Sequence, residues 1–143
     1  MMMFDQVGSA CQLAGGPPEQ GPSFVKALKS FAAGVGELER EALYALRCSL
    51  VHDFSLVNIG SSRRTHHFML DDGEQLGPVV RLPPEPWDGQ LGHCRMSNAT
   101  WVSLRSLGDS AEEVFTRLVD LHEQNELAIA LPAAWRSCSA GTP

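Results

Sequence analysis

Apolar residues recur with helical spacing between residues 37 and 57. Each stands three or four positions after the one before it, which is the repeat of one helix face. On an ideal helix these side chains fall within an arc of about 80°, a width suited to packing on a core. The pattern therefore predicts a long helix over 37–57 whose core stripe is Leu43, Leu46, Leu50, Phe54 and Val57.

Three further segments favour helices. Residues 105–125 carry a second long stripe, and residues 1–14 a shorter one. The Pro/Gly-rich connector 15–22 ends the first segment, and Ser23 is a candidate N-cap for a helix that Gly34 and Gly36 close.

Two short segments favour strands. "THHFML" and "PVVRLP" flank the turn-rich "DDGEQLG", so the sequence predicts a β-hairpin that pairs 65–70 with 79–82. "ATWVSL" (99–104) is a short strand or a lead-in to the last helix. The expected fold is mainly α, a small helical bundle with an inserted β-hairpin. It forms a single domain over 1–131, followed by a flexible C-terminal tail, 132–143.

Composition narrows the class of protein. The chain has 143 residues, 43% of them hydrophobic and 20% charged, which is typical of one folded domain. Its apolar runs are shorter than the ~18 residues of a membrane span, and its start lacks a basic region followed by a long apolar one. We expect a cytoplasmic protein without membrane contact. The net charge of −6 excludes a generally basic surface, so any nucleic-acid contact depends on the local basic segment "SSRRTHH" (61–67).

No metal or other cofactor is expected. The four cysteines are scattered without a C-x-x-C pair, which argues against a zinc ribbon or a redox motif. His66, His67, His93 and Cys94 have suitable ligand atoms but stand as adjacent pairs, without the usual ligand spacing.

The 37–57 helix has a second, partly apolar strip. Tyr44, Cys48, Val51, His52 and Ser55 lie on it, and such a strip packs on another helix of the chain or on a second copy of the protein. Arg47 and His52 lie at its two edges, about 140° apart on an ideal helix. They are a poor catalytic pair within one chain. Two copies packed antiparallel about a two-fold axis bring both pairs to one shared groove.

The run "LYALRCSLVHDFSLVN" resembles the R-x4-6-H signature of the HEPN superfamily, with Arg47 and His52 in the motif positions. The resemblance implies a small dimeric helical bundle of HEPN type. It also implies a metal-independent endoribonuclease of a bacterial defence or toxin–antitoxin system, including abortive infection, with RNA as substrate and an antitoxin as partner. In that chemistry Arg47 holds the scissile phosphate and His52 moves the proton. Cys48 and Asp53 support the site, and Arg63 and Arg64 bind flanking phosphates. Cys48 departs from the polar residue that often follows the arginine.

Other roles for the same residues stay open. Arg47 is equally suited to an ion pair with a nearby acid such as Glu41 or Asp53, and His52 to an interface without chemistry. Cys48 and His52 also have the spacing of a thiolate–imidazolium dyad, although no third orienting group is evident. The alternative function is a non-catalytic HEPN-like helical dimer that binds nucleotides, RNA or another protein.

Overall fold

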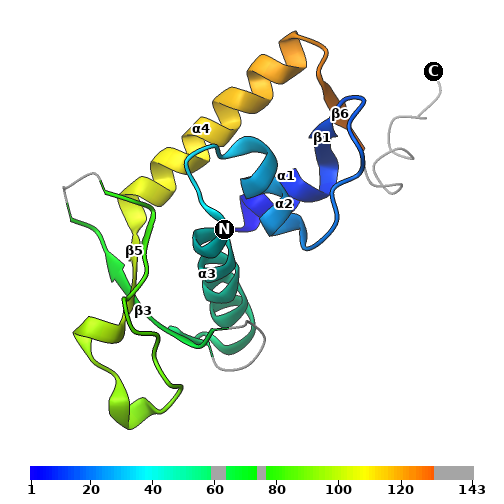
Figure 1. Cartoon of the computed structure of the whole chain (residues 1–143). Helices are drawn as coiled ribbons and strands as arrows, with labels where there is room; N and C mark the ends of the chain where they lie inside the picture. Colours follow the sequence, from blue (N-terminus) through cyan, green and yellow to red (C-terminus); the bar gives the residue numbers. More distant parts are fainter. Residues whose placement is uncertain (59–63, 74–76, 131–143) are drawn as a thin grey trace, which may run out of the picture.

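Two small sheets lie at opposite ends of one long helix (Figure 1). The structure, a computed structural model, describes residues 1–58, 64–73 and 77–130. The α-helices are α1 (Met2–Ala10), α2 (Ser23–Phe31), α3 (Glu37–Cys48) and α4 (Leu104–Glu123). A two-stranded sheet pairs β1 (Cys11–Leu13) with β6 (Leu127–Ile129), and a four-stranded sheet has the order β2 (Val57–Asn58), β3 (His66–Asp71), β5 (Thr100–Ser103), β4 (Val80–Arg81).

The expectation of a mainly α bundle is wrong. Helix takes 50% of the chain and strand 16%, and the larger sheet is mixed, so the fold is α/β. The prediction failed because several strands are only two or three residues long and leave no alternating pattern to detect. The predicted tail 132–143 lies outside the described residues, as does part of the turn expected between the two hairpin strands.

The predicted hairpin is also wrong, although both of its strands exist. The strand β5 lies between them, parallel to β3 and antiparallel to β4. Thr100 and Val102 of β5 are buried toward the helices, while Trp101 and Ser103 are half-buried on the other face. A strand with apolar groups on both faces suits the inside of a sheet, so "ATWVSL" takes the central place and separates the two expected partners.

One hydrophobic core joins α1, α2, α3, α4 and the inner face of the four-stranded sheet. It holds the fully buried Phe24, Leu28, Leu43, Val102 and Val114. Leu43 and Leu46 belong to the stripe predicted for the third helix. The helix α2 begins at Ser23, with Pro22 at its N-cap, so Ser23 is the first helical residue. None of the helices in these ranges has the length and apolarity that crossing a bilayer requires.

The helices α1 and α2 approach each other closely at Gly8. A Cβ atom at Gly8 would lie 1.7 Å from the carbonyl oxygen of Ser23 and 3.0 Å from the backbone nitrogen of Ala27. Because both atoms belong to the backbone of α2, a side chain at Gly8 would force the two helices apart.

We therefore expect Gly8→Ala to lower the free energy of unfolding by roughly 1–3 kcal/mol, as overpacking does. Gly108→Ala is the matched control, because Gly108 is an exposed glycine of α4 with open space around it. Helix propensity alone should make that change stabilising, by up to about 1 kcal/mol. Denaturant unfolding of the two variants tests the contact, and a Gly8→Ala protein as stable as the wild type would contradict it.

The imidazole of His66 is buried at the start of β3. Its Nδ1 lies 2.9 Å from the hydroxyl oxygen of Thr100, and its ring stacks on Phe68. Burial, and then the positive charge of Arg64, lower the pKa of His66 from its ordinary 6.5 to about 4. The ring is therefore neutral in the folded protein at neutral pH.

Stability should consequently fall in mild acid. The unfolded chain binds a proton at His66 below about pH 6.5 and the folded chain only near pH 4, so the unfolding free energy is highest above pH 6.5. Between pH 6.5 and 5 it should drop by about 2 kcal/mol. Denaturant unfolding across this pH range tests the prediction. In His66→Gln the unfolding free energy should depend less on pH. In His122→Gln, a control at an exposed site, the pH dependence should be that of the wild type. If the unfolding free energy of His66→Gln kept the pH dependence of the wild type, the proton taken up on unfolding would bind at another residue.

Candidate functional site at the end of helix α3

The third helix changes its geometry inside the Arg47–His52 motif. It is α-helical to Cys48, continues as a π-helical turn, Ser49–Asp53, and stops at Phe54, which has the left-handed backbone angles φ 49° and ψ 39°. Single π turns within helices are rare and often occur at functional sites. The regular helix predicted over 37–57 is therefore wrong beyond Cys48.

Ser49 provides a local cause for this change. Its buried hydroxyl donates a hydrogen bond of 2.8 Å to the carbonyl oxygen of Ala45, one turn earlier. The side-chain nitrogen of Asn58 donates to the same oxygen at 3.3 Å. The backbone N–H of Ser49 donates to this oxygen as well, so the regular helical bond is kept there, and a serine hydroxyl that bonds back in this way often bends its helix. The end of α3 is thus tied to β2, whose second residue is Asn58.

The change of geometry gives two residues positions that differ from those on the predicted regular helix. Phe54, expected in the core stripe, is 92% exposed, because the π turn and the left-handed residue take it off the regular helix face. His52 is exposed on the π turn. Since each residue of a π turn rotates less than about 100°, the angle between Arg47 and His52 is smaller than on a regular helix.

Arg47 is anchored by an acid that the sequence did not single out. Its Nε donates to Oδ2 of Asp5 on α1 at 3.0 Å, and the two side chains are 22% and 29% exposed. This hydrogen bond raises the pKa of Arg47 above its ordinary value. The acid is neither Glu41 nor Asp53, and its position 42 residues earlier gives no local signal in the sequence.

The guanidinium keeps donors for another anion. Asp5 accepts from Nε, the Cys48 side chain also interacts with the guanidinium, and the other four N–H groups belong to the two terminal nitrogens. An Arg that is oriented by one carboxylate and half-buried is suited to bind a planar or tetrahedral anion through its outer edge.

Tyr44 and Cys48 lie beside Arg47 and face their own chain. The ring of Tyr44 packs on Phe24 of α2, with 6.3 Å between centroids. Burial, and then a hydrogen bond with Cys48, raise the pKa of the Tyr44 phenol. The second, partly apolar strip of the helix therefore packs on α1 and α2 as far as Cys48. Val51 and His52 remain exposed.

Three exposed apolar residues stand close together in the sequence at the end of α3, and we call them the apolar cluster. They are Val51, which is 46% exposed, Phe54, which is 92% exposed, and Leu56, which is 39% exposed. Asp53 is exposed on the same turn. In the described ranges no hydrogen bond or ion pair joins His52 to Arg47, so one chain by itself does not assemble the predicted pair.

The remaining predicted residues lie elsewhere. Arg63 is outside the described residues, and Arg64 is exposed just before β3. His67 contacts Asn98, and His93 pairs with Asp88. Over the residues that the structure describes, no group of three or more His, Cys, Asp or Glu side chains could hold a metal ion.

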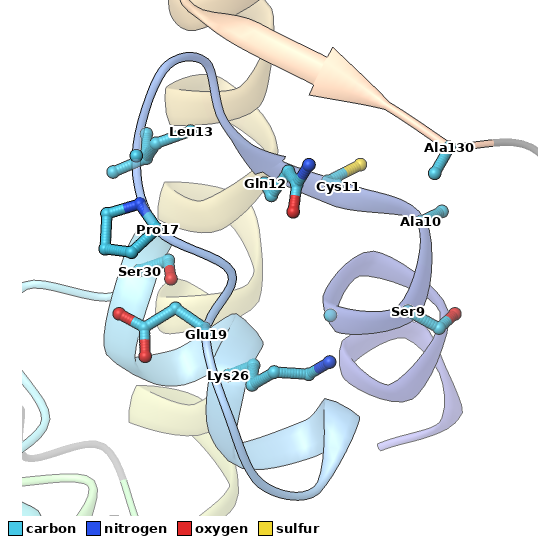
Figure 2. A pocket seen from close by; sticks show the side chains of 12 residues that line it. Ser9, Ala10, Cys11, Gln12, Leu13, Pro17, Glu19, Lys26, Ser30 and Ala130 are labelled. Atoms are coloured by element: carbon cyan, nitrogen blue, oxygen red, sulfur yellow. The ribbon is translucent and has the colours of Figure 1, made fainter.

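A small cavity lies between α1, β1 and α2 (Figure 2). Its volume is about 150 Å³, and Cys11, Glu19 and Lys26 are among its lining residues. Burial raises the pKa of the Cys11 thiol, which makes it a poorer nucleophile. The cavity is also smaller than the ~300 Å³ of ordinary ligand pockets, so it is a weak candidate for a site.

Comparison with known proteins finds no match to this chain among family models, curated proteins or solved structures.

Proposed function

We propose that the end of α3 forms a metal-independent RNA-cleaving site when two copies of the chain associate. The observation that carries the proposal is the irregular turn inside the Arg47–His52 motif. A bulky residue with positive φ is an outlier, and strained backbone of this kind costs about 1–3 kcal/mol. Phe54 adopts it while 92% exposed, where it makes no compensating core contact.

This combination favours a surface that is completed by a partner. An exposed phenyl ring gains free energy when it is buried, about 1.5–3 kcal/mol for a complete burial. Val51 and Leu56 extend the apolar area on both sides of Phe54 in the chain. A two-fold dimer buries the same cluster from both copies and brings each His52 near the other copy's motif.

The chemistry follows from the residue types. One His52 takes the proton of an RNA 2′-hydroxyl, the 2′-oxygen attacks the adjacent phosphorus, and the bond to the 5′-oxygen breaks. The second His52 gives a proton to that oxygen. The products are a 2′,3′-cyclic phosphate and a 5′-hydroxyl. Arg47, held by Asp5, binds the phosphate and stabilises the charge that develops there. The reaction needs a 2′-hydroxyl, so DNA is not a substrate.

A second candidate function has its own support. The positive charge of Arg47 is already paired with Asp5 inside the chain, and the thiol of Cys48 is a weak hydrogen-bond donor beside it. Both features favour a non-catalytic dimer that uses the α3 end for association alone. An antitoxin partner remains part of the catalytic proposal.

Cleavage of mixed single-stranded RNA in EDTA separates the two functions. Arg47→Ala and His52→Ala should each abolish cleavage, and the double variant should be little worse, because residues that act as a unit are non-additive. His122→Ala, which removes an exposed histidine of α4, should cleave like the wild type. Cleavage that survives His52→Ala would come from another site or a contaminant and would contradict the proposed site. A wild type that cleaves nothing would favour the association function.

Phe54→Asn tests the association itself. Asparagine tolerates positive φ better than phenylalanine, so the dilute monomer should be equally stable or up to about 1 kcal/mol more stable. The dimer should weaken at least tenfold, because each copy loses an apolar contact. Phe115→Gln, which removes an exposed phenyl from α4, should not affect it. Light scattering across concentrations gives the readout, and a monomeric wild type at micromolar concentration would contradict the dimer.

A further inference from the structure

The outer face of the four-stranded sheet carries a Trp–Arg pair that the α3 site does not use. Trp101 of β5 is directly opposite Arg81 of β4 and Met69 of β3 in the sheet register. The Cζ atom of Arg81 lies 5.4 Å from the centre of the Trp101 ring, a cation–π contact. The ring is half-buried, so part of this stack is open to a ligand.

Two hollows flank this pair. One has a volume of about 390 Å³ and includes Trp101, Arg81 and Pro83 in its wall. The other, of about 230 Å³, includes His67, Met69 and Arg95. Met96 and Ala99 line both, so the two hollows are adjacent on the same face. We call this joint depression the sheet groove.

The charge of the sheet groove is opposite to that of the whole chain. The chain has a net charge of −6, yet none of the described residues that line the two hollows is Asp or Glu. Arg81 and Arg95 are the cationic lining residues. The Arg95 guanidinium is oriented by hydrogen bonds from Nη1 to the carbonyl oxygens of Gly92 and Cys94. The groove therefore combines an aromatic plane with two arginine side chains.

We propose that the sheet groove binds a single strand of RNA, with one base stacked on the Trp101–Arg81 pair and phosphates bound by Arg81 and Arg95. Aromatic rings and guanidinium planes are the usual platforms for unstacked bases. The larger hollow is of the size that small organic ligands occupy. The inference deepens the proposed function, on which it rests for the identity of the strand as RNA.

The groove also leads toward the α3 end. His67, which lines the smaller hollow, pairs with Val57 of β2, and β2 follows the irregular turn after only a few residues. Two strand spacings, about 10 Å, separate β5 from β2. A strand bound across the sheet from β5 therefore reaches β2, which follows the turn that contains His52 after a few residues.

Fluorescence anisotropy with a short labelled oligouridine tests the groove. All proteins carry His52→Ala, which prevents cleavage. Trp101→Leu should weaken binding at least about fivefold and Trp101→Phe should retain most of it, since base stacking tolerates any aromatic plane. Arg81→Ala should weaken binding and reduce the salt slope by about one. Phe115→Leu and Arg117→Ala, on α4, are the matched controls and should bind normally. Circular dichroism of each variant verifies folding.

The outcomes separate the groove from the cleavage site. Stacking is tolerant of the sugar, so a labelled deoxyoligonucleotide should bind the groove although it cannot be cleaved. A wild type that cleaves RNA while Trp101→Leu binds oligouridine normally would overturn the groove and leave the catalytic proposal standing. If oligonucleotide binding depends on Trp101 but the wild-type protein does not cleave RNA, the groove proposal is supported and the catalytic proposal is not. The groove proposal would be overturned if the protein bound no oligonucleotide, or if the groove bound a proline-rich peptide and not an oligonucleotide.

Discussion

The carbonyl oxygen of Ala45 accepts hydrogen bonds from the side chains of Ser49 and Asn58, and this shared acceptor joins α3 to the larger sheet. Both donors are buried, where an unpaired polar group costs on the order of 1–3 kcal/mol. The geometry of the chain from residue 45 to 58 is constrained by this requirement. The π turn begins at the first donor, Ser49, the left-handed Phe54 follows it, and β2 ends at the second donor, Asn58.

The same constraint separates the α-helical part of this segment, which ends at Cys48, from the irregular turn that follows it. Up to Cys48 the side chains contact α1 and α2, and Arg47 is held there by Asp5. Val51, His52, Asp53 and Phe54, which follow, are exposed. The arginine held by Asp5 and the exposed turn therefore lie about one helical turn apart on the same segment.

The four-stranded sheet connects this turn with the Trp101–Arg81 pair. Its inner face contributes Phe68, Val80 and Val102 to the core, which holds the strands rigidly. Its outer face carries Met69, Trp101 and Arg81, which lie outside that core. The central place of β5 decides this arrangement, since Trp101 faces Met69 and Arg81 only because its strand lies between theirs.

The sequence by itself determined where most elements lie. The periodicity of Leu43 and Leu46 and that of residues 105–125 placed α3 and α4, and β-rich segments marked β3, β4 and β5. It also pointed to Arg47 and His52 as the residues to examine. These signals are local, because they arise from repeats within one turn or one strand.

Only the tertiary structure decided which elements meet. The insertion of β5 between β3 and β4, the ion pair of Arg47 with Asp5 and the exposure of Phe54 depend on contacts between residues far apart in the chain. Hydrophobic periodicity carries no information about such partners, because any apolar face can be buried by many others. The choice among them also depends on buried hydrogen-bonding groups that must all find partners, as the side chains of Ser49 and Asn58 do at the carbonyl oxygen of Ala45.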